Sequence, residues 1–151
     1  MNLSENFTLD ELVYSTIAEK RDIQNVPNAE QIENLKHLAI NVLQPIRNKF
    51  NCQVYIDSGF RCKELNAAVG GADSSQHRAL NKDAAADLRV VKVPMADVFR
   101  YIQDYLTFDQ LIWEKGSNTS PQWIHVSFSR IRNRKQVLKF NGKNYVSFKL
   151  P

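Results

Sequence analysis

Two histidines and one aspartate stand out in this chain because each lies in or beside an apolar or strand-forming segment. His125 lies within the strand-like segment 123–128. Asp87 follows the three alanines at 84–86, and His77 lies a few residues before these alanines. Burying such side chains without partners is costly. Two imidazole nitrogens and one carboxylate oxygen, with a fourth position open to water, are the usual ligands of a catalytic zinc ion. The residues alone leave a zinc site and a set of satisfied structural residues equally open.

Most of the remaining polar candidates fall in one stretch, residues 58–88. This stretch contains Arg61, two adjacent glycines, and Ser75 two residues before His77. It contains no His-Glu-x-x-His zinc-protease motif and no Gly-x-Ser-x-Gly nucleophile motif. The paired glycines resemble a turn rather than a phosphate-binding loop.

Composition indicates a globular protein without membrane spans. Of 151 residues, 43% are hydrophobic and 24% are charged, which argues against wholesale disorder. No apolar run approaches the length of a membrane helix, and the N-terminus lacks the features of a signal peptide. Cys52 and Cys62 do not form a disulfide framework, and we expect free thiols.

The formal net charge of +4 favours anionic partners only weakly. Much of it lies in the basic segment 130–135, which we interpret as a solvated turn rather than a binding patch. The aromatic residues fall mostly on predicted core faces, whereas nucleic-acid modules interleave exposed aromatic and basic residues. We therefore expect no nucleic-acid partner.

The N-terminal third is predicted to be helical. Thr8 and Glu11 have the form of a capping box, which predicts a short helix to about residue 18. Asn28, with Gln31 three positions on, is expected to cap the clearest helix of the chain. Pro45 lies inside this second pattern and should kink or end the helix. The apolar positions that define it are Ile32, Leu35, Leu38, Val42, Leu43 and Ile46.

The rest of the chain alternates between strands and short helices. Residues 61–69 are predicted to form a short helix or turn, and Pro94 opens a helix with an apolar core face. Asn141-Gly142 predicts a hairpin over residues 136–148. The other predicted strands are 53–57, 85–90, 110–114 and 123–128. This order predicts an α+β fold, an antiparallel sheet with helices packed on one side.

The chain resembles the zinc D-Ala-D-Ala carboxypeptidase family, which includes phage L-Ala-D-Glu endopeptidases and has the zinc fold of the hedgehog signalling domain. The resemblance covers residues 7–128, which implies one zinc peptidase domain over 1–151 with a C-terminal hairpin at 136–148. The motifs that carry it are Ser58-Gly-Phe-Arg61, Leu65-Asn66, Val69-Gly-Gly71, Ser75-Gln-His77, Ala85-Ala-Asp87-Leu88 and Trp123-Ile-His125-Val-Ser127.

The resemblance implies a role for each matching residue. His77, Asp87 and His125 match the ligands of one zinc ion. Arg61 matches the arginine that binds substrate and steadies the developing oxyanion. Ser75 matches a serine that contacts substrate.

The general base is assigned less directly, because its place varies within the family. Glu114 is the only glutamate between Asp87 and the C-terminus. It ends a predicted strand just before the strand of His125. We take Glu114 as the residue that removes a proton from water and returns it to the leaving amine.

One departure from the family pattern concerns the second ligand. The family usually places the aspartate seven residues after the histidine, in His-x-x-Gly-x-Ala-x-Asp, whereas ten residues separate His77 from Asp87 here. Either the loop bulges, or Asp83 replaces Asp87, or the site has lost its metal. The retained context around Asp87 favours the first alternative. Residues 78–82 would then form a lip on the cleft and alter substrate choice.

These observations predict a monomeric zinc metallopeptidase that cuts a peptide bond in peptidoglycan stem peptides. Within the same class, a phage-type L-Ala-D-Glu endolysin is an alternative to a carboxypeptidase. The altered ligand spacing raises a further alternative, a non-catalytic module that binds cell-wall peptides or a protein through a degenerate zinc site. Without a signal peptide, we expect synthesis in the cytoplasm and action on the cell wall after release, as for phage or prophage proteins.

Overall fold

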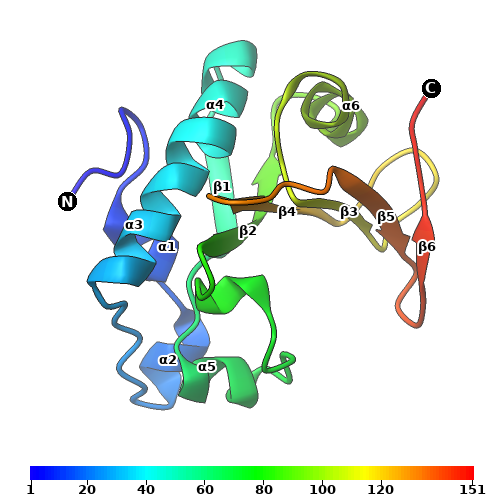
Figure 1. The fold of residues 1–151 in the computed structure, drawn as a ribbon. Coiled ribbons are helices and arrows are strands. Elements are labelled where there is room, and N and C mark those ends of the chain that lie inside the picture. The colour runs from blue at the N-terminus through cyan, green and yellow to red at the C-terminus, as the bar shows by residue number, and fades with distance from the viewer.

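A single six-stranded sheet runs through the molecule in the order β1-β2-β4-β3-β5-β6 (Figure 1). The computed structural model describes residues 1–151. The strands are β1 (Val54–Ser58), β2 (Asp83–Val90), β3 (Gln110–Glu114), β4 (Trp123–Ser129), β5 (Gln136–Phe140) and β6 (Tyr145–Ser147). Each predicted strand is present to within two residues, and the predicted α+β fold is confirmed.

The sheet is antiparallel, as expected, at every pair except β3–β5, which is parallel. This pair arises because the chain leaves β4, passes the start of β3 and enters β5 on the far side of β3. The hairpin predicted at Asn141-Gly142 forms between β5 and β6, and Gly142 adopts the left-handed φ of 100°. The hairpin therefore extends the main sheet.

The two faces of the sheet differ in chemistry because successive side chains of a strand point to opposite sides. On one face, fully buried apolar residues of β2, β3 and β4 join a core that runs from Leu3 to Leu150. Helices α3 (Ala29–Leu38) and α6 (Met95–Tyr105) supply the facing residues, and Phe99 packs edge-on against Trp113. The long helices thus cover one face and leave the other free. On the basis of this shared core we propose that residues 1–151 form one domain.

The N-terminal helices differ in two details from the prediction. The first helix is divided into α1 (Leu9–Val13) and α2 (Thr16–Lys20), because Ser15 caps a new helix after the extended Tyr14. Pro45 was expected to kink or end the second helix; the helical run continues past it, and the α-helical pattern is interrupted just before it. A π-helical turn, Ala39–Leu43, precedes α4 (Gln44–Phe50), so that proline enters near the first turn of a new helical segment, where its missing N–H is tolerated.

The remaining helices follow the prediction. Helix α5 (Lys63–Ala68) ends before the paired glycines, and α6 begins directly after Pro94. No helix is both long and apolar enough to cross a membrane. Cys52 and Cys62 are free thiols.

Asp109 joins three segments at the edge of the free face. It accepts three bonds from Arg134, one from the backbone N–H and two from the guanidinium at 2.9 and 2.7 Å, and a fourth from Gln76. Burial by itself would raise the pKa of Asp109, but the bonds from Arg134 and Gln76 lower it to about 2. This carboxylate fixes the start of β3 against the segment that leads into β5.

Gly59 lies where the end of β1 touches α1. The N–H of Phe60 donates to the carbonyl oxygen of Leu12 at 2.7 Å, and a Cβ at Gly59 would collide with the same carbonyl. We expect Gly59→Ala to lower the free energy of unfolding by about 1–3 kcal/mol, because the two segments must move apart. Urea denaturation measures this change, and an unchanged midpoint would show that the contact can relax without cost.

The Asp109 network predicts a pH-dependent contribution to stability. Because the folded-state pKa lies below the ordinary value, the ionised carboxylate stabilises the fold above about pH 4, and this stability is lost as the pH falls through about 2. Asp109→Asn should cost about 2 kcal/mol at pH 7 and progressively less toward pH 2.

Urea denaturation of both proteins across this pH range tests the expectation. Asp57→Asn is the matched control, because Asp57 forms a similar two-point pair with Arg89 at the surface and should contribute under about 1 kcal/mol. An equal loss at pH 7 and pH 2.5 for Asp109→Asn would contradict the assignment.

Candidate metal centre

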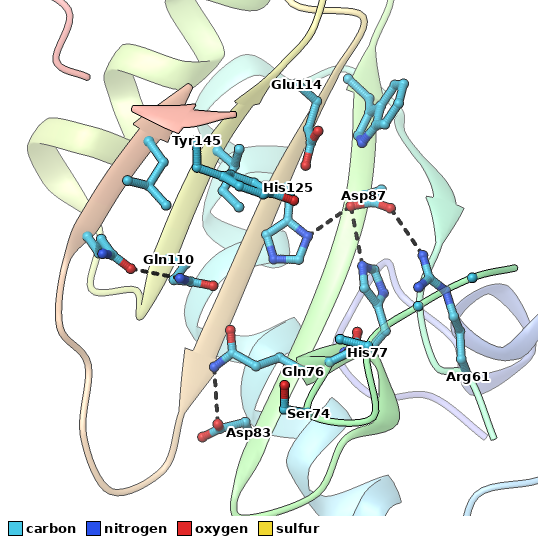
Figure 2. A pocket seen from close by; sticks show the side chains of 18 of the residues that line it. Arg61, Ser74, Gln76, His77, Asp83, Asp87, Gln110, Glu114, His125 and Tyr145 are labelled. Atoms are coloured by element: carbon cyan, nitrogen blue, oxygen red, sulfur yellow. Dashed lines mark hydrogen bonds and ion pairs between the residues drawn. The ribbon is translucent and has the colours of Figure 1, made fainter. Parts of the chain in front are cut away.

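The free face of the sheet brings together the two histidines and the aspartate (Figure 2). Asp87 of β2 and His125 of β4 are direct partners in the antiparallel register. His77 reaches them from a short 3-10 turn, Gln76–Arg78. Oδ1 of Asp87 lies 3.4 Å from Nε2 of His77 and 3.0 Å from Nδ1 of His125. The potential ligand atoms all lie within 4.8 Å of one another.

The hydrogen bonds of His77 define which of its nitrogens is free. Nδ1 lies 2.8 Å from the carbonyl oxygen of Gly59, which can only accept, so Nδ1 carries the proton. Nε2 then carries a lone pair. This nitrogen is buried, lacks a hydrogen-bond partner and faces a carboxylate oxygen. Two facing acceptors call for a cation between them.

These groups fit a zinc ion. Tetrahedral zinc with nitrogen and oxygen ligands separates the ligand atoms by about 3.4 Å, close to the distance between His77 Nε2 and Asp87 Oδ1. The bond from Nδ1 to Gly59 fixes the tautomer and the ring orientation, as outer-shell bonds do in metal sites. The donor set is therefore compatible with the metal that the sequence predicts.

Burial and charge act on the same three residues. Burial lowers the pKa of His77, so the neutral imidazole that can bind a metal is favoured, although the charge of Asp87 opposes this shift. Burial alone would raise the pKa of Asp87, but the two histidines hold it well below the ordinary carboxyl value. The group therefore presents an ionised carboxylate and a neutral imidazole.

Arg61 lies at one side of this group. Its Nη2 is 3.7 Å from Oδ2 of Asp87, and its Nε donates to Ser58 at 3.1 Å. Its backbone N–H donates to the carbonyl of His77. Burial lowers the pKa of Arg61 and Asp87 opposes the shift, but a guanidinium remains charged in proteins.

Asn25 positions the Arg61 segment, a role that the sequence did not reveal. Its amide donates to the carbonyls of Val13 and Phe60, and its oxygen accepts from the N–H of Cys62. These partners lie up to 37 residues away along the chain. No local pattern around residue 25 predicts such a contact.

We call His77, Asp87 and His125 the metal group. Ser75 and Glu114 both line the cleft around it. The hydroxyl of Ser75 accepts from the N–H of His77, which leaves its hydrogen free to donate. Glu114 ends β3, pairs with Trp123 of β4 and points to the same face as His125, two residues along that strand. Burial raises the pKa of Glu114, an effect that His125 opposes and the carboxylate of Asp87 reinforces.

The lengthened loop after His77 does not form the expected lip. Residues 78–82 are absent from the cleft wall and pack instead against α3, where Gln31 and Asn34 donate to the carbonyls of Arg78 and Ala79. Left-handed conformations at Ala79 and at residues 81 and 82 turn the chain in this direction. The added length is accommodated away from the site.

The structure places Asp87, and not Asp83, against both histidines. Asp83 starts β2 four residues earlier and accepts a bond from Gln76 at 3.1 Å. The same strand face contains both carboxylates, but only Asp87 lies opposite His125.

The cleft has a volume of about 790 Å³ and extends well beyond the metal group. Strand alternation could have identified Gln110 and Ile112, which share the face of Glu114. It could not have identified Leu138 and Tyr145, because only the parallel β3–β5 pairing brings the hairpin to this face.

A comparison with known families adds to this geometry. The family model described as peptidase M15 matches residues 5–127, which is more than half of the chain. No curated protein matches the chain significantly. The matched region contains all three members of the metal group, together with Arg61 and Glu114, and ends before the hairpin. The chain therefore belongs to the peptidase M15 family, the zinc metallopeptidases similar to D-Ala-D-Ala carboxypeptidases.

Proposed function

We propose that this chain hydrolyses a peptide bond in peptidoglycan stem peptides, with His77, Asp87 and His125 as the ligands of one zinc ion. The observation that supports this proposal best is the buried lone pair on Nε2 of His77. It has no hydrogen-bond partner, and it faces the carboxylate oxygen that His125 also faces. A site of purely structural residues would place a donor there.

A zinc ion bound by these residues would supply a Lewis acid that polarises a carbonyl and makes water a stronger nucleophile near neutral pH. Glu114 would then accept the proton that this water loses. Its carboxylate lies on the same face as His125, and its raised pKa brings it closer to the operating pH, where a base can accept a proton from water and return it to the leaving amine.

Arg61 and Ser75 act on the substrate. The guanidinium of Arg61 lines the cleft beside Asp87, so a fixed positive charge is available where negative charge develops on the substrate carbonyl. The free hydroxyl hydrogen of Ser75 can donate to the bound peptide. Both side chains are held by bonds to neighbouring residues before substrate binds, which reduces the cost of reorganisation.

Metal content is the first test of this proposal. The purified protein should hold about one zinc ion per chain without chelators, and His125→Ala should retain far less. His37→Ala is the matched control, because His37 is a partly exposed histidine whose side chain pairs only with Glu33. Elemental analysis of the three proteins gives the answer, and a wild type without metal would refute the peptidase proposal.

The role of Glu114 is tested separately. Glu114→Gln should lower kcat by about 10²–10⁴-fold and leave the zinc content unchanged, because the amide cannot accept the proton. Glu33→Gln serves as a surface control. The assay measures products released from defined muropeptides, which also identifies the bond that is cut. Unchanged turnover would remove Glu114 from the mechanism.

A further inference from the structure

Beyond the metal group, the cleft continues over the part of the sheet that includes the C-terminal hairpin. His125 pairs with Ile112, and Ile112 pairs with Leu138, so these three residues form one row across the sheet. Residues paired in this way point to the same face. Ile112 and Leu138 both line the cleft, and they form an apolar floor next to His125.

Two walls border this floor. On one side Glu114 pairs with Phe140, which pairs with Tyr145, and the rings of Phe140 and Tyr145 lie 4.4 Å apart. On the other side the amide of Gln110 donates to Gln136 at 2.7 Å. Figure 2 shows Tyr145 reaching over the cleft toward His125, with Arg61 beyond Asp87 on the opposite side.

The charges around the floor are already accounted for. Arg134 at the edge of the cleft is bound at two points by Asp109. The hydroxyl of Tyr145 forms no hydrogen bond within the chain, and the residue is 56% exposed, so this hydroxyl is available to a ligand. Burial, and then the charges of Glu114 and Asp87, raise the pKa of Tyr145, which keeps the phenol protonated as a donor.

We propose that the hairpin supplies a substrate-binding subsite on the side of the metal group away from Arg61, with Leu138 as its floor and Tyr145 as its wall. The subsite takes an uncharged substrate residue with a small apolar side chain, since the floor offers apolar contact and Tyr145, Gln110 and Gln136 offer neutral hydrogen-bonding groups. This inference rests on the proposed peptidase function. It concerns residues that lie outside the segment matched by the family, 5–127.

Charge substitutions at Leu138 test the subsite. The probes are synthetic stem peptides built around the bond that the wild type cleaves, in which the residue on either side of that bond is D-Ala, D-Glu or D-Lys. Leu138→Lys should raise kcat/KM for the D-Glu peptide relative to the D-Ala peptide by about fivefold, and Leu138→Glu should do the same for the D-Lys peptide. The peptides are varied on one side of the cleaved bond or on the other. The side at which the variation changes kcat/KM identifies the substrate residue that occupies the subsite.

Val146 offers a matched control on the same hairpin. It pairs with Lys139, whose side chain lies over Trp113 on the opposite face, and it is 51% exposed outside the cleft. Val146→Lys and Val146→Glu should leave the peptide preferences within about twofold. If the Leu138 variants behave like the Val146 variants, the subsite proposal is wrong.

Tyr145→Phe tests the wall without removing the ring. We expect kcat/KM on the D-Ala peptide to fall about three- to tenfold, as the loss of one hydrogen bond predicts, whereas Tyr105→Phe on α6 should have no effect. Zinc content should be unchanged in both variants. Equal activity of Tyr145→Phe and wild type would remove the hydroxyl from the subsite.

Peptide binding to Glu114→Gln protein, followed by NMR chemical-shift changes, gives a readout that does not depend on turnover. If Leu138→Lys or Leu138→Glu, added to the Glu114→Gln protein, changes which of the charged peptides binds more tightly, the result supports the subsite even though this protein does not cleave them. If the wild type cleaves the peptides and the Leu138 variants keep the wild-type preference among them, the subsite is refuted and the proposed function stands. If the peptides are neither bound nor cleaved, the proposed function fails and the subsite fails with it.

Discussion

The Asp87 carboxylate, held between two imidazoles and a guanidinium, is the interaction on which the rest of the site depends. Burying a carboxylate is unfavourable unless positive charge or donors surround it. His77 cannot supply its proton here, because the carbonyl of Gly59 fixes that proton on the other nitrogen. Nε2 of His77 and the carboxylate of Asp87 therefore face each other with no proton between them, and a divalent cation would stabilise both.

The fold supplies this arrangement through strand pairing and one rigid turn. The β2–β4 register fixes Asp87 opposite His125, and the same alternation directs Leu88 and Ile124 into the core on the other face. A slip of one residue would exchange these faces, so core burial and site geometry are specified together. His77 is less constrained by the sheet and depends on its bond to Gly59, whose own position depends on α1.

The hairpin extends the cleft beyond the segment that the family model matches. The family match ends at residue 127, yet the sheet continues through β5 and β6 and adds a second half to the cleft. Asp109 and Arg134 fix the segment that leads into β5, which positions the hairpin against β3. This part of the cleft wall is therefore carried by a strand pair that contributes none of the three metal-group residues.

Much of the fold follows from local patterns, because capping, alternation and turn chemistry act between neighbours in the chain. The capping boxes at Thr8 and Asn28 form as predicted, and so does the hairpin at Asn141-Gly142. The resemblance identified the residues of the metal group, and the structure brings them together.

Other features depended on contacts between distant segments. The clamp made by Asn25 and the parallel β3–β5 pair have no local signal, since their partners lie far away in sequence. The direction of the loop after His77 was also decided by tertiary structure, because Gln31 and Asn34 on α3 capture its carbonyls. The sequence by itself determined which side chains share a strand face. Only the packing of strands and helices decided which of those faces meet, because that choice depends on burying one common core.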